Sequence, residues 1–451
     1  MKKAIFLAFV CIFLSSCAAK FDEFMQKEAL QIQPNLSELD QIQSWWKAYE
    51  NEPISLIIEA LLRHNSQINV ARYSLLSTVA RYKLINFDLY PSLSGNLGAS
   101  IAKDLNLGTR SNAFSNALNL SYELDLYGKI IDEKSSAEFS ARASLYELES
   151  LKLSLINQGI NNSFELVYFN DVEKLLKEYI SNLEEAKRIY TLKYELGRVE
   201  ELDLLNIEQS LLNAKQNLLQ NEQNKELILK TLKDLLGNKD SFTLIDRLLE
   251  LSLSDFKELS VNFDLSLEAF TNRPDVKASA SSLSAAFKSY KAVQKSMYPT
   301  VSLGANLSGN STELNESFKL VNLGGVFQLS LPFLDYGRVR QNVQISKFAY
   351  ESLKTSYEQT LQSAINEFYA CYKDYEYNIK LYENIKLINS KEALITKAYL
   401  QKYELGRAEL KDYLDARNSF INSSQEILRS RLNLLKTINS YFQITARSEN
   451  L

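Results

Sequence analysis

Two aspartates near the end of the chain, Asp412 and Asp415, are the residues whose type and spacing most readily suggest a binding function. Residues three positions apart on a helix lie on the same face, so the two carboxylates are expected side by side. Carboxylates crowded in this way attract cations and raise one another's pKa values. Aspartates on a helix are also common on an ordinary solvated surface, and the pair alone leaves both interpretations open.

The residues that most enzymes and metal sites require are scarce. His64 is the single histidine, so a histidine-based metal site or nucleophile pair would have to use it, and its neighbours predict an ordinary helix. Cys371 is expected to pack inside a helical stretch, and no disulfide is expected in the mature chain. The net charge is -4, with no basic patch and no glycine-rich phosphate loop. We therefore expect no catalysis, no cofactor, no metal and no nucleic-acid partner.

A repeated hexapeptide organises the sequence. Lys-Tyr-Glu-Leu-Gly-Arg occurs at residues 193–198 and again at 402–407, which is 209 residues later. Further residues match at the same offset, including Asp203 with Asp412. Two long copies indicate a tandem duplication of one structural unit and not a solenoid of short repeats.

The N-terminus has the features of a bacterial lipoprotein signal. Residues 1–16 combine a charged start with a short apolar run, which is typical of a secretory signal peptide. Leu-Ser-Ser-Cys at 14–17 matches the lipobox, which predicts that Cys17 carries acyl chains as a lipid anchor. Residues 17–52 are predicted to be an extended leader from this anchor. The alternative is an ordinary signal peptide with an incidental cysteine.

The first repeat is predicted at 53–237 and the second at 271–445, each with a helix, a β-hairpin, a long helix and a return helix. In the first repeat the predicted elements are a helix at 54–88, a hairpin at 92–126 and a long helix at 129–196. In the second they are a helix from Arg273-Pro274-Asp275, a hairpin at 300–333 and a long helix at 338–405. Residues 238–270 have no repeat partner and are predicted to form a small equatorial side domain, and 446–451 a C-terminal tail.

Residue patterns distinguish the strands from the helices. In each hairpin apolar residues alternate with polar or small ones, as in strands with one apolar face. The long helices contain no proline and would each reach on the order of 100 Å. Gly197 and Gly406 are expected to end them in left-handed turns. After Gly197, apolar residues at alternating steps of three and four predict a coiled-coil seam in the return helix.

Four amphipathic strands per chain are too few to close a membrane barrel, which needs about eight. Open sheet edges are not tolerated in lipid. The strands must therefore either pack on helices as a soluble sheet or be pooled by several chains, and the alternation alone leaves both arrangements open.

The order of these features resembles the TolC-type outer-membrane efflux proteins, also called outer-membrane factors. The resemblance rests on Trp45-Trp46, Arg273-Pro274-Asp275, a Tyr-Pro before each hairpin, Leu-Tyr-Gly or Asp-Tyr-Gly after it, and the doubled Tyr-x-x-Gly-Arg. It implies an α+β membrane protein and a homotrimer, whose twelve strands form one outer-membrane β-barrel continued by a long periplasmic α-helical barrel. With the lipobox, it implies the lipid-anchored branch of the family.

The resemblance also implies a gate at the periplasmic ends of the helical hairpins. In the family, aspartates six and nine residues beyond the glycine of the bend line the closed aperture. Asp412 and Asp415 match these positions after Gly406, and Asp203 matches the first of them after Gly197. A trimer would bring six carboxylates of Asp412 and Asp415 into a ring.

Polar links near the bend hold this gate shut in the family, and Tyr194 and Tyr403 occupy matching positions. The family's gate arginine, two residues beyond the glycine, is absent. Ala408 stands there, and Arg407 lies one residue earlier, so the sequence departs from the family at this link.

The same bends are expected to be the exposed tips of the molecule. Gly197, Arg198, Gly406 and Arg407 are therefore predicted to form the docking surface for a periplasmic adaptor (membrane fusion) protein, which in turn joins an inner-membrane pump.

The implied function is a passive exit duct in the cell outer membrane for drugs and other small molecules. One alternative within the family is the exit duct of a type I protein secretion system. A structural coiled-coil lipoprotein would not explain two matched hairpins, and the scarcity of catalytic residues argues against a soluble periplasmic enzyme.

Overall fold

The computed structural model describes residues 45–106, 108, 110–237, 242–264 and 270–445. The predicted signal peptide, Cys17 and the C-terminal tail lie outside these residues. The described chain divides into two compact units. The strand unit consists of Ala71–Leu148 and Asp275–Thr360, and the hairpin unit consists of the remaining described residues. Both repeats contribute to both units.

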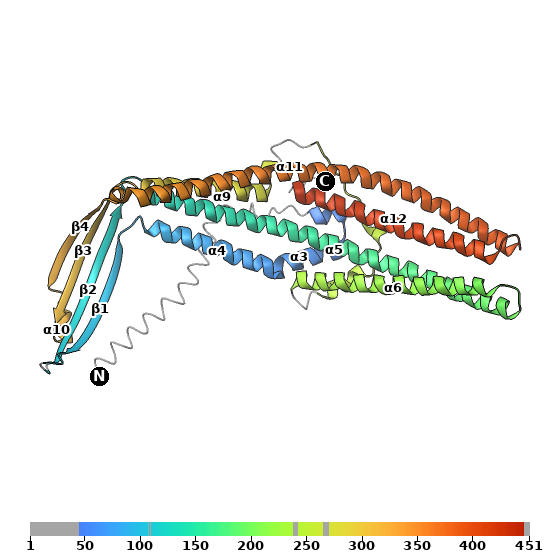
Figure 1. The fold of residues 1–451 in the computed structure, drawn as a ribbon, viewed down its shortest axis with the longest axis horizontal. Coiled ribbons are helices and arrows are strands. Elements are labelled where there is room, and N and C mark those ends of the chain that lie inside the picture. The colour runs from blue at the N-terminus through green and yellow to red at the C-terminus, as the bar shows by residue number, and fades with distance from the viewer. Residues whose placement is uncertain (1–44, 107, 109, 238–241, 265–269, 446–451) are drawn as a thin grey trace. The chain divides into compact units, whose positions relative to one another are not determined.

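The strand unit contains a four-stranded antiparallel sheet in the order β1-β2-β3-β4 (Figure 1). The strands are β1 (Ser92–Lys103), β2 (Arg110–Leu124), β3 (Thr300–Ser311) and β4 (Asn322–Ser330). β2 of the first repeat pairs with β3 of the second, which joins the two hairpins into one sheet. Because neighbouring strands are antiparallel, both hairpin loops lie at one end of the sheet and all connections to helices lie at the other.

The strand register gathers the larger apolar side chains on one face, here called the apolar sheet face. Directly opposed pairs on this face are Leu93 and Leu120, Leu118 and Leu307, and Leu303 and Phe327. Asn119 and Asn306, which are hydrogen-bonded to each other, lie on the opposite, polar sheet face. The predicted alternation is confirmed. In the single chain the apolar sheet face is largely exposed, with Leu97 at 78% and Leu323 at 81%.

Four helices connect to the sheet. They are α4 (Ser66–Phe87), α5 (Lys129–Glu195), α9 (Pro274–Lys295) and α11 (Tyr336–Glu404). Among the described helices, none is both long enough and apolar enough to cross a membrane.

A buried charge joins the two repeats within the strand unit. The carboxylate of Asp132 in α5 contacts the ammonium groups of Lys288 at 3.2 Å and Lys295 at 2.6 Å, both in α9. Burial raises the pKa of Asp132, but the hydrogen bonds and charges of the two lysines outweigh it and hold that pKa below its usual value. The carboxylate is therefore ionised at neutral pH and links α5, which follows the first β-hairpin, to α9, which precedes the second.

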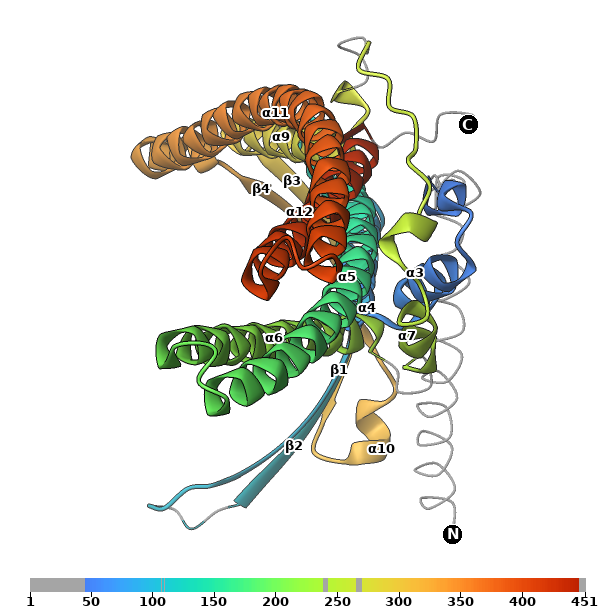
Figure 2. The same ribbon diagram turned by 90° about the vertical axis from the view of Figure 1, so that its right-hand side faces the viewer.

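The hairpin unit contains one helical hairpin from each repeat (Figure 2). α6 (Glu201–Leu236) returns along α5, and α12 (Leu410–Thr445) returns along α11. Thr396 Oγ1 of α11 donates to Ala416 O of α12 at 2.9 Å. The predicted seam of α6 is confirmed by its buried residues Ile207, Leu211 and Ala214.

Short elements pack on these hairpins. They are a 3-10 helix η1 (Trp45–Tyr49), α3 (Glu52–His64), α7 (Thr243–Leu248) and a 3-10 turn η3 (Leu253–Asp255). Arg431 of α12 donates to Leu253 O at 2.8 Å and to Phe256 O at 2.9 Å. These bonds fix Leu253 and Phe256, in the described part of the predicted side domain (residues 238–270), to the second helical hairpin.

The predicted extended leader, residues 17–52, is wrong in its last part, because the aromatic residues of η1 are buried. Trp45 Nε1 donates to Asn439 Oδ1 at 2.9 Å, and Asn439 Nδ2 donates to Asn157 O at 3.1 Å. Aromatic rings bury a large apolar area, which explains why this stretch folds onto the helices.

The single helix predicted at 54–88 is also wrong, since the structure has α3 and α4 with a break at Asn65. Asn65 is extended, with ψ of 129°. Its Oδ1 accepts from Gln67 N at 2.8 Å, and its Nδ2 donates to Leu235 O at 2.8 Å. Asparagine at this position caps the second helix and ties it to α6, which a reading of apolar spacing does not detect.

The hairpin predicted at 300–333 is shorter than expected and has a folded loop. β4 ends at Ser330, and a 3-10 helix η4 (Pro332–Asp335) follows, because proline lacks the N–H that a strand ladder needs. The loop contains a single helical turn, α10 (Leu314–Ser317).

Candidate functional site

The repeated hexapeptide forms the turn at the end of each helical hairpin. Gly197 and Gly406 have φ of 64° and 69°, in the left-handed region. The amides of Arg198 and Arg407 each donate to the carbonyl of the lysine five residues earlier, at 2.8 Å in both copies. This is a Schellman cap, in which glycine takes the left-handed position without a Cβ clash. The predicted left-handed turns are confirmed, and the two copies have the same geometry.

The two turns present the same side chains to solvent. Leu196 and Leu405 are 69% and 68% exposed, and Arg198 and Arg407 are exposed beside them. In each copy the lysine of the hexapeptide lies over a tyrosine ring three residues earlier, at 5.5 and 5.3 Å from the ring centroid. The duplication has therefore produced two equivalent exposed surfaces.

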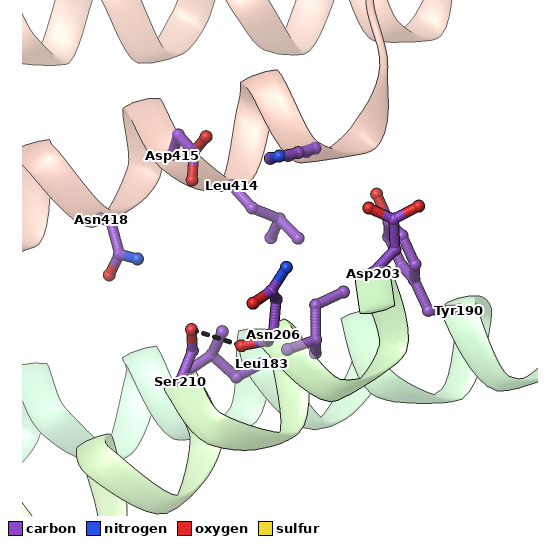
Figure 3. A pocket seen from close by; sticks show the side chains of 10 residues that line it. Leu183, Tyr190, Asp203, Asn206, Ser210, Leu414, Asp415 and Asn418 are labelled. Carbon is purple, nitrogen blue, oxygen red and sulfur yellow. Dashed lines mark hydrogen bonds between the residues drawn. The ribbon is translucent and has the colours of Figure 1, made fainter. Parts of the chain in front are cut away.

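A small pocket of about 70 Å³ lies between the two hairpins, near the starts of α6 and α12 (Figure 3). Its polar lining comes from three helices: Tyr190 of α5, Asp203, Asn206 and Ser210 of α6, and Lys411, Asp415 and Asn418 of α12. Asp203 and Asp415 thus line one pocket from different repeats.

The predicted acidic residues have different surroundings. Asp203 and Asp415 line the pocket, whereas Asp412 Oδ2 accepts from Glu409 N at 3.1 Å and so caps the start of α12. In the first repeat, Asn206 occupies the position that corresponds to Asp415. Within one chain, the two pocket carboxylates therefore come from different repeats, and Asp412, the expected partner of Asp415, is instead bonded to the backbone at the start of α12.

The two tyrosines expected at the gate also differ. Tyr403 packs against a buried cluster that includes Tyr190, Ile207 and Leu410. Tyr194, the corresponding residue of the first repeat, is 42% exposed. Only the second copy of this tyrosine therefore contributes to the contact between the hairpins.

Tyr190 is a polar group that the sequence analysis did not single out. Burial raises the pKa of its phenol, and the negative charges of Asp203 and Glu409 raise it further. The phenol is therefore protonated at neutral pH and remains a hydrogen-bond donor near the carboxylates. The sequence feature that could have indicated Tyr190 is its match with Tyr399, 209 residues later.

An ion pair between the hairpins was also missed. Arg417 of α12 pairs with Glu178 of α5, with side chains 21% and 56% exposed. The residue at the corresponding position of the first repeat is Glu208, which instead pairs with Lys187 inside its own hairpin at 3.0 Å. The two matched positions carry opposite charges, and this difference is the sequence feature that could have indicated the ion pair.

The described ranges hold no group of three or more His, Cys, Asp or Glu side chains that could bind a metal ion. The charged residues that line the pocket are two aspartates and a lysine. The pocket therefore places charged groups close together near the ends of the helical hairpins, where they can attract or repel ions.

Comparison with known proteins gives a match in both repeats. The family model described as "Outer membrane efflux protein" matches residues 57–238 and 265–446. The chain is 28% identical to "Toxin and drug export protein A" of Aggregatibacter actinomycetemcomitans over 454 residues, covering 99% of this chain and 98% of the relative. It is 25% identical to "Cation efflux system protein CusC" of Escherichia coli (strain K12), covering 89% of this chain and 88% of that protein.

The fold is also similar to solved structures. The crystal structure of the Campylobacter jejuni CmeC outer membrane channel matches with a TM-score of 0.80 and 24% identity, over 89% of this chain and 87% of that chain. This likeness shows that the strands and helices of the chain have the same fold as that solved structure.

Proposed function

Because the chain belongs to the outer membrane efflux protein family, we propose that it is the outer-membrane channel of a tripartite efflux system. In this role it is a passive exit duct for drugs and other small molecules from the periplasm to the exterior, and it catalyses no reaction. The observation that carries the proposal is the family match in both repeats, combined with a four-stranded sheet that has one apolar and one polar face.

The sheet supports a barrel shared by three copies. Its strands have 9 to 15 residues, and a tilted membrane strand needs about 9–11. In the described chain β1 and β4 form the two edges of the sheet, and open edges are unfavourable in lipid. Pairing β4 of each copy with β1 of the next closes twelve strands around a lumen lined by the polar sheet face. The helices continue as a periplasmic tunnel.

Exposed leucines support packing between the helices of neighbouring copies. Leu205, Leu212 and Leu219 recur every seven residues along α6 and are 51%, 68% and 67% exposed. Leu387 and Leu394 of α11 have the same spacing and are each 62% exposed. A seven-residue apolar repeat is the seam of a coiled coil. The proposed occupant of these faces is a second copy of the chain, with α6 of one copy against α11 of the next.

The proposed gate lies at the ends of the hairpins. Asp203 and Asp415 line one pocket there, and three copies would multiply these carboxylates, together with Asp412, around the axis of the tunnel. The turns with Gly197 and Gly406 bound the opening. Negative charge at a narrow entrance attracts cations. Repulsion between the crowded carboxylates decreases when the hairpins separate.

The proposed adaptor-docking surface is the pair of equivalent turns. Leu196 and Leu405 supply exposed apolar groups, and Arg198 and Arg407 supply positive charge beside them. Two copies of one surface per chain suit a periplasmic adaptor protein that binds both repeats in the same way. The adaptor would link the channel to an inner-membrane pump.

The proposed location is the outer membrane, with the helices in the periplasm and Cys17 acylated in the lipid. Mass spectrometry of the mature N-terminal peptide tests the anchor. A diacylated cysteine at residue 17 is expected, and Cys17→Ser should yield an unmodified chain.

A second candidate function is the exit duct of a type I protein secretion system. The relative from Aggregatibacter actinomycetemcomitans is named for the export of toxin as well as drug. Deleting the channel from its own cell separates the two cargoes: loss of drug resistance alone supports efflux, and loss of a secreted protein alone supports secretion.

Electron microscopy of the mature protein, extracted from outer membrane in mild detergent, tests the architecture. A particle with three-fold symmetry, a membrane cap and a long hollow stem is expected. A monomer, or a solid rod without a cap, would contradict the shared barrel.

A further inference from the structure

The connection between β3 and β4 folds back over the sheet. Its helical turn α10 ends at Ser317, which is fully buried at 0% exposure. Asn116 Nδ2 of β2 donates to Ser317 Oγ at 2.7 Å, and Ser317 Oγ donates to Leu314 O at 2.7 Å. Asn116 is itself only 5% exposed. The connection is therefore bonded to a strand of the preceding hairpin, near the loop end of the sheet.

Two independent features put α10 on the apolar sheet face. Side chains two residues apart in a strand point to the same face, so Asn116 shares the face of Leu118. Gly309 of β3 lies directly opposite Asn116. A Cβ added to Gly309 would lie 2.1 Å from Ser317 O. The turn thus covers the sheet on the side that bears the leucines, and the polar sheet face is left open.

Asn116 explains why the turn is there. It is a polar residue on a face that is otherwise largely apolar, and an amide without a partner is strongly unfavourable in contact with hydrocarbon. Ser317 supplies the hydrogen bond, and Gly309 supplies the space for close approach. α10 therefore removes the Asn116 amide from the outer surface of the sheet.

Two large apolar side chains of the connection are exposed in the single chain. Leu314 is 44% exposed and Phe318 is 50% exposed. Leu320 has φ of 45°, a left-handed conformation that is uncommon for leucine, and it turns the chain tightly past Gly309. Aromatic side chains at the ends of membrane strands typically lie at the boundary between acyl chains and headgroups.

We propose that the β3–β4 connection is a lipid-contacting element, with Leu314 and Phe318 inserted among the acyl chains at the outer boundary of the membrane. This inference rests on the proposed function, because that function turns the apolar sheet face toward lipid. β2 and β3 are the two central strands of the chain's sheet. A neighbouring copy that joins at β1 or β4 would not cover α10, so the occupant of this surface is membrane lipid and not another copy.

Tryptophan fluorescence in the full-length protein tests the proposal. Phe318→Trp is reconstituted into phosphatidylcholine vesicles with either plain or brominated acyl chains, since bromine quenches tryptophan that lies among the chains. The unsubstituted protein, with buried Trp45 and Trp46, provides the background signal. Leu323→Trp reports the apolar sheet face, and Asn310→Trp reports the polar sheet face.

We expect Phe318→Trp and Leu323→Trp to lose comparable fractions of their fluorescence in brominated vesicles, while Asn310→Trp keeps its signal. Loss from Leu323→Trp without loss from Phe318→Trp would overturn the inference and leave the proposed function intact. Loss from neither would overturn the proposed placement of the sheet in the membrane, and the inference with it.

A second substitution links the signal to the packing of α10. Gly309→Ala places a Cβ against Ser317 O and should displace the turn, which reduces quenching of Phe318→Trp but not of Leu323→Trp. Gly325→Ala is the matched control, because it lies on the same face of β4 with nothing within 4 Å of its Cβ position. Equal quenching of Phe318→Trp in both glycine variants would refute the role of Gly309 in positioning the connection, while the lipid contact of Phe318 would stand.

Discussion

If the proposed channel has a closed state, the ion pair between Arg417 and Glu178 should contribute to holding the two helical hairpins together in it. It joins α12 to α5 next to the pocket that Asp203 and Asp415 share. Arg417 is 21% exposed and Glu178 is 56% exposed, so water screens the pair. We therefore assign it about 0.2–1 kcal/mol, the value of an exposed pair, and not the much larger value of a dry interior.

Three copies of this pair would break together if the gate opens symmetrically, which amounts to about 0.6–3 kcal/mol. Since about 1.4 kcal/mol changes an equilibrium tenfold, Arg417→Gln should raise the ratio of open to closed channels by roughly 3- to 100-fold. The measurement is single-channel recording of the purified trimer in planar bilayers. The difference from the unsubstituted channel should shrink at about 1 M salt, where the screening length falls to about 3 Å.

Lys187→Gln is the control, because Lys187 pairs with Glu208 inside one hairpin. It removes one surface charge without removing a link between hairpins, and its open probability should stay unchanged. If Arg417→Gln opens the channel no more than Lys187→Gln does, the ion pair does not hold the hairpins together. The same conclusion follows if the effects of Arg417→Gln and Glu178→Gln simply add in the double variant, because paired residues must be coupled.

Three further predictions concern the charges at the tips and between the repeats. Asp412→Asn with Asp415→Asn should weaken block of the channel by divalent cations, since asparagine keeps the cap of α12 but removes the negative charge; equal block in planar bilayers would count against the gate. Arg198→Glu with Arg407→Glu should lower drug resistance while the trimer persists in native gels, and unchanged resistance would exclude these arginines from adaptor docking. Asp132 has a pKa lowered by its two lysine partners despite its burial, so its stabilising effect is present above the unfolded pKa of about 3.9 and is lost as pH falls through the folded value. Asp132→Asn should therefore lower the stability of the protein at neutral pH. Between about pH 7 and pH 3, the stability of the variant should fall less than that of the unsubstituted protein, measured as thermal unfolding by circular dichroism.

Much of the architecture could be read from the sequence because it depends on local patterns. The alternation in the hairpins follows from the two-residue period of a strand, and the left-handed turns at Gly197 and Gly406 follow from the freedom of glycine. The repeated hexapeptide indicated that both ends would have the same geometry. Each of these features is determined within a few residues of the chain, and the structure agrees with each.

Long-range contacts were harder to predict. Asn65 breaks a helix because its side chain reaches Leu235, 170 residues away. The aromatic residues of η1 fold inward because Asn439 at the other end of the chain accepts a bond from Trp45. In both cases the side-chain amide of an asparagine is hydrogen-bonded to a residue far away in the sequence, and the spacing of apolar residues gives no indication of such a bond.

The candidate site likewise has features that the sequence indicates and others that depend on long-range packing. Which carboxylates lie near the turns could be read from the residues alone, because the duplication matches Asp203 with Asp412. Their roles depend on how the helices pack, since a carboxylate near a helix start either caps that helix or faces a neighbouring one. Asp412 accepts a backbone N–H in its own turn, while Asp203 and Asp415 meet at one pocket. The packing of one hairpin against the other selects between these two outcomes, and that packing depends on residues more than 200 positions apart.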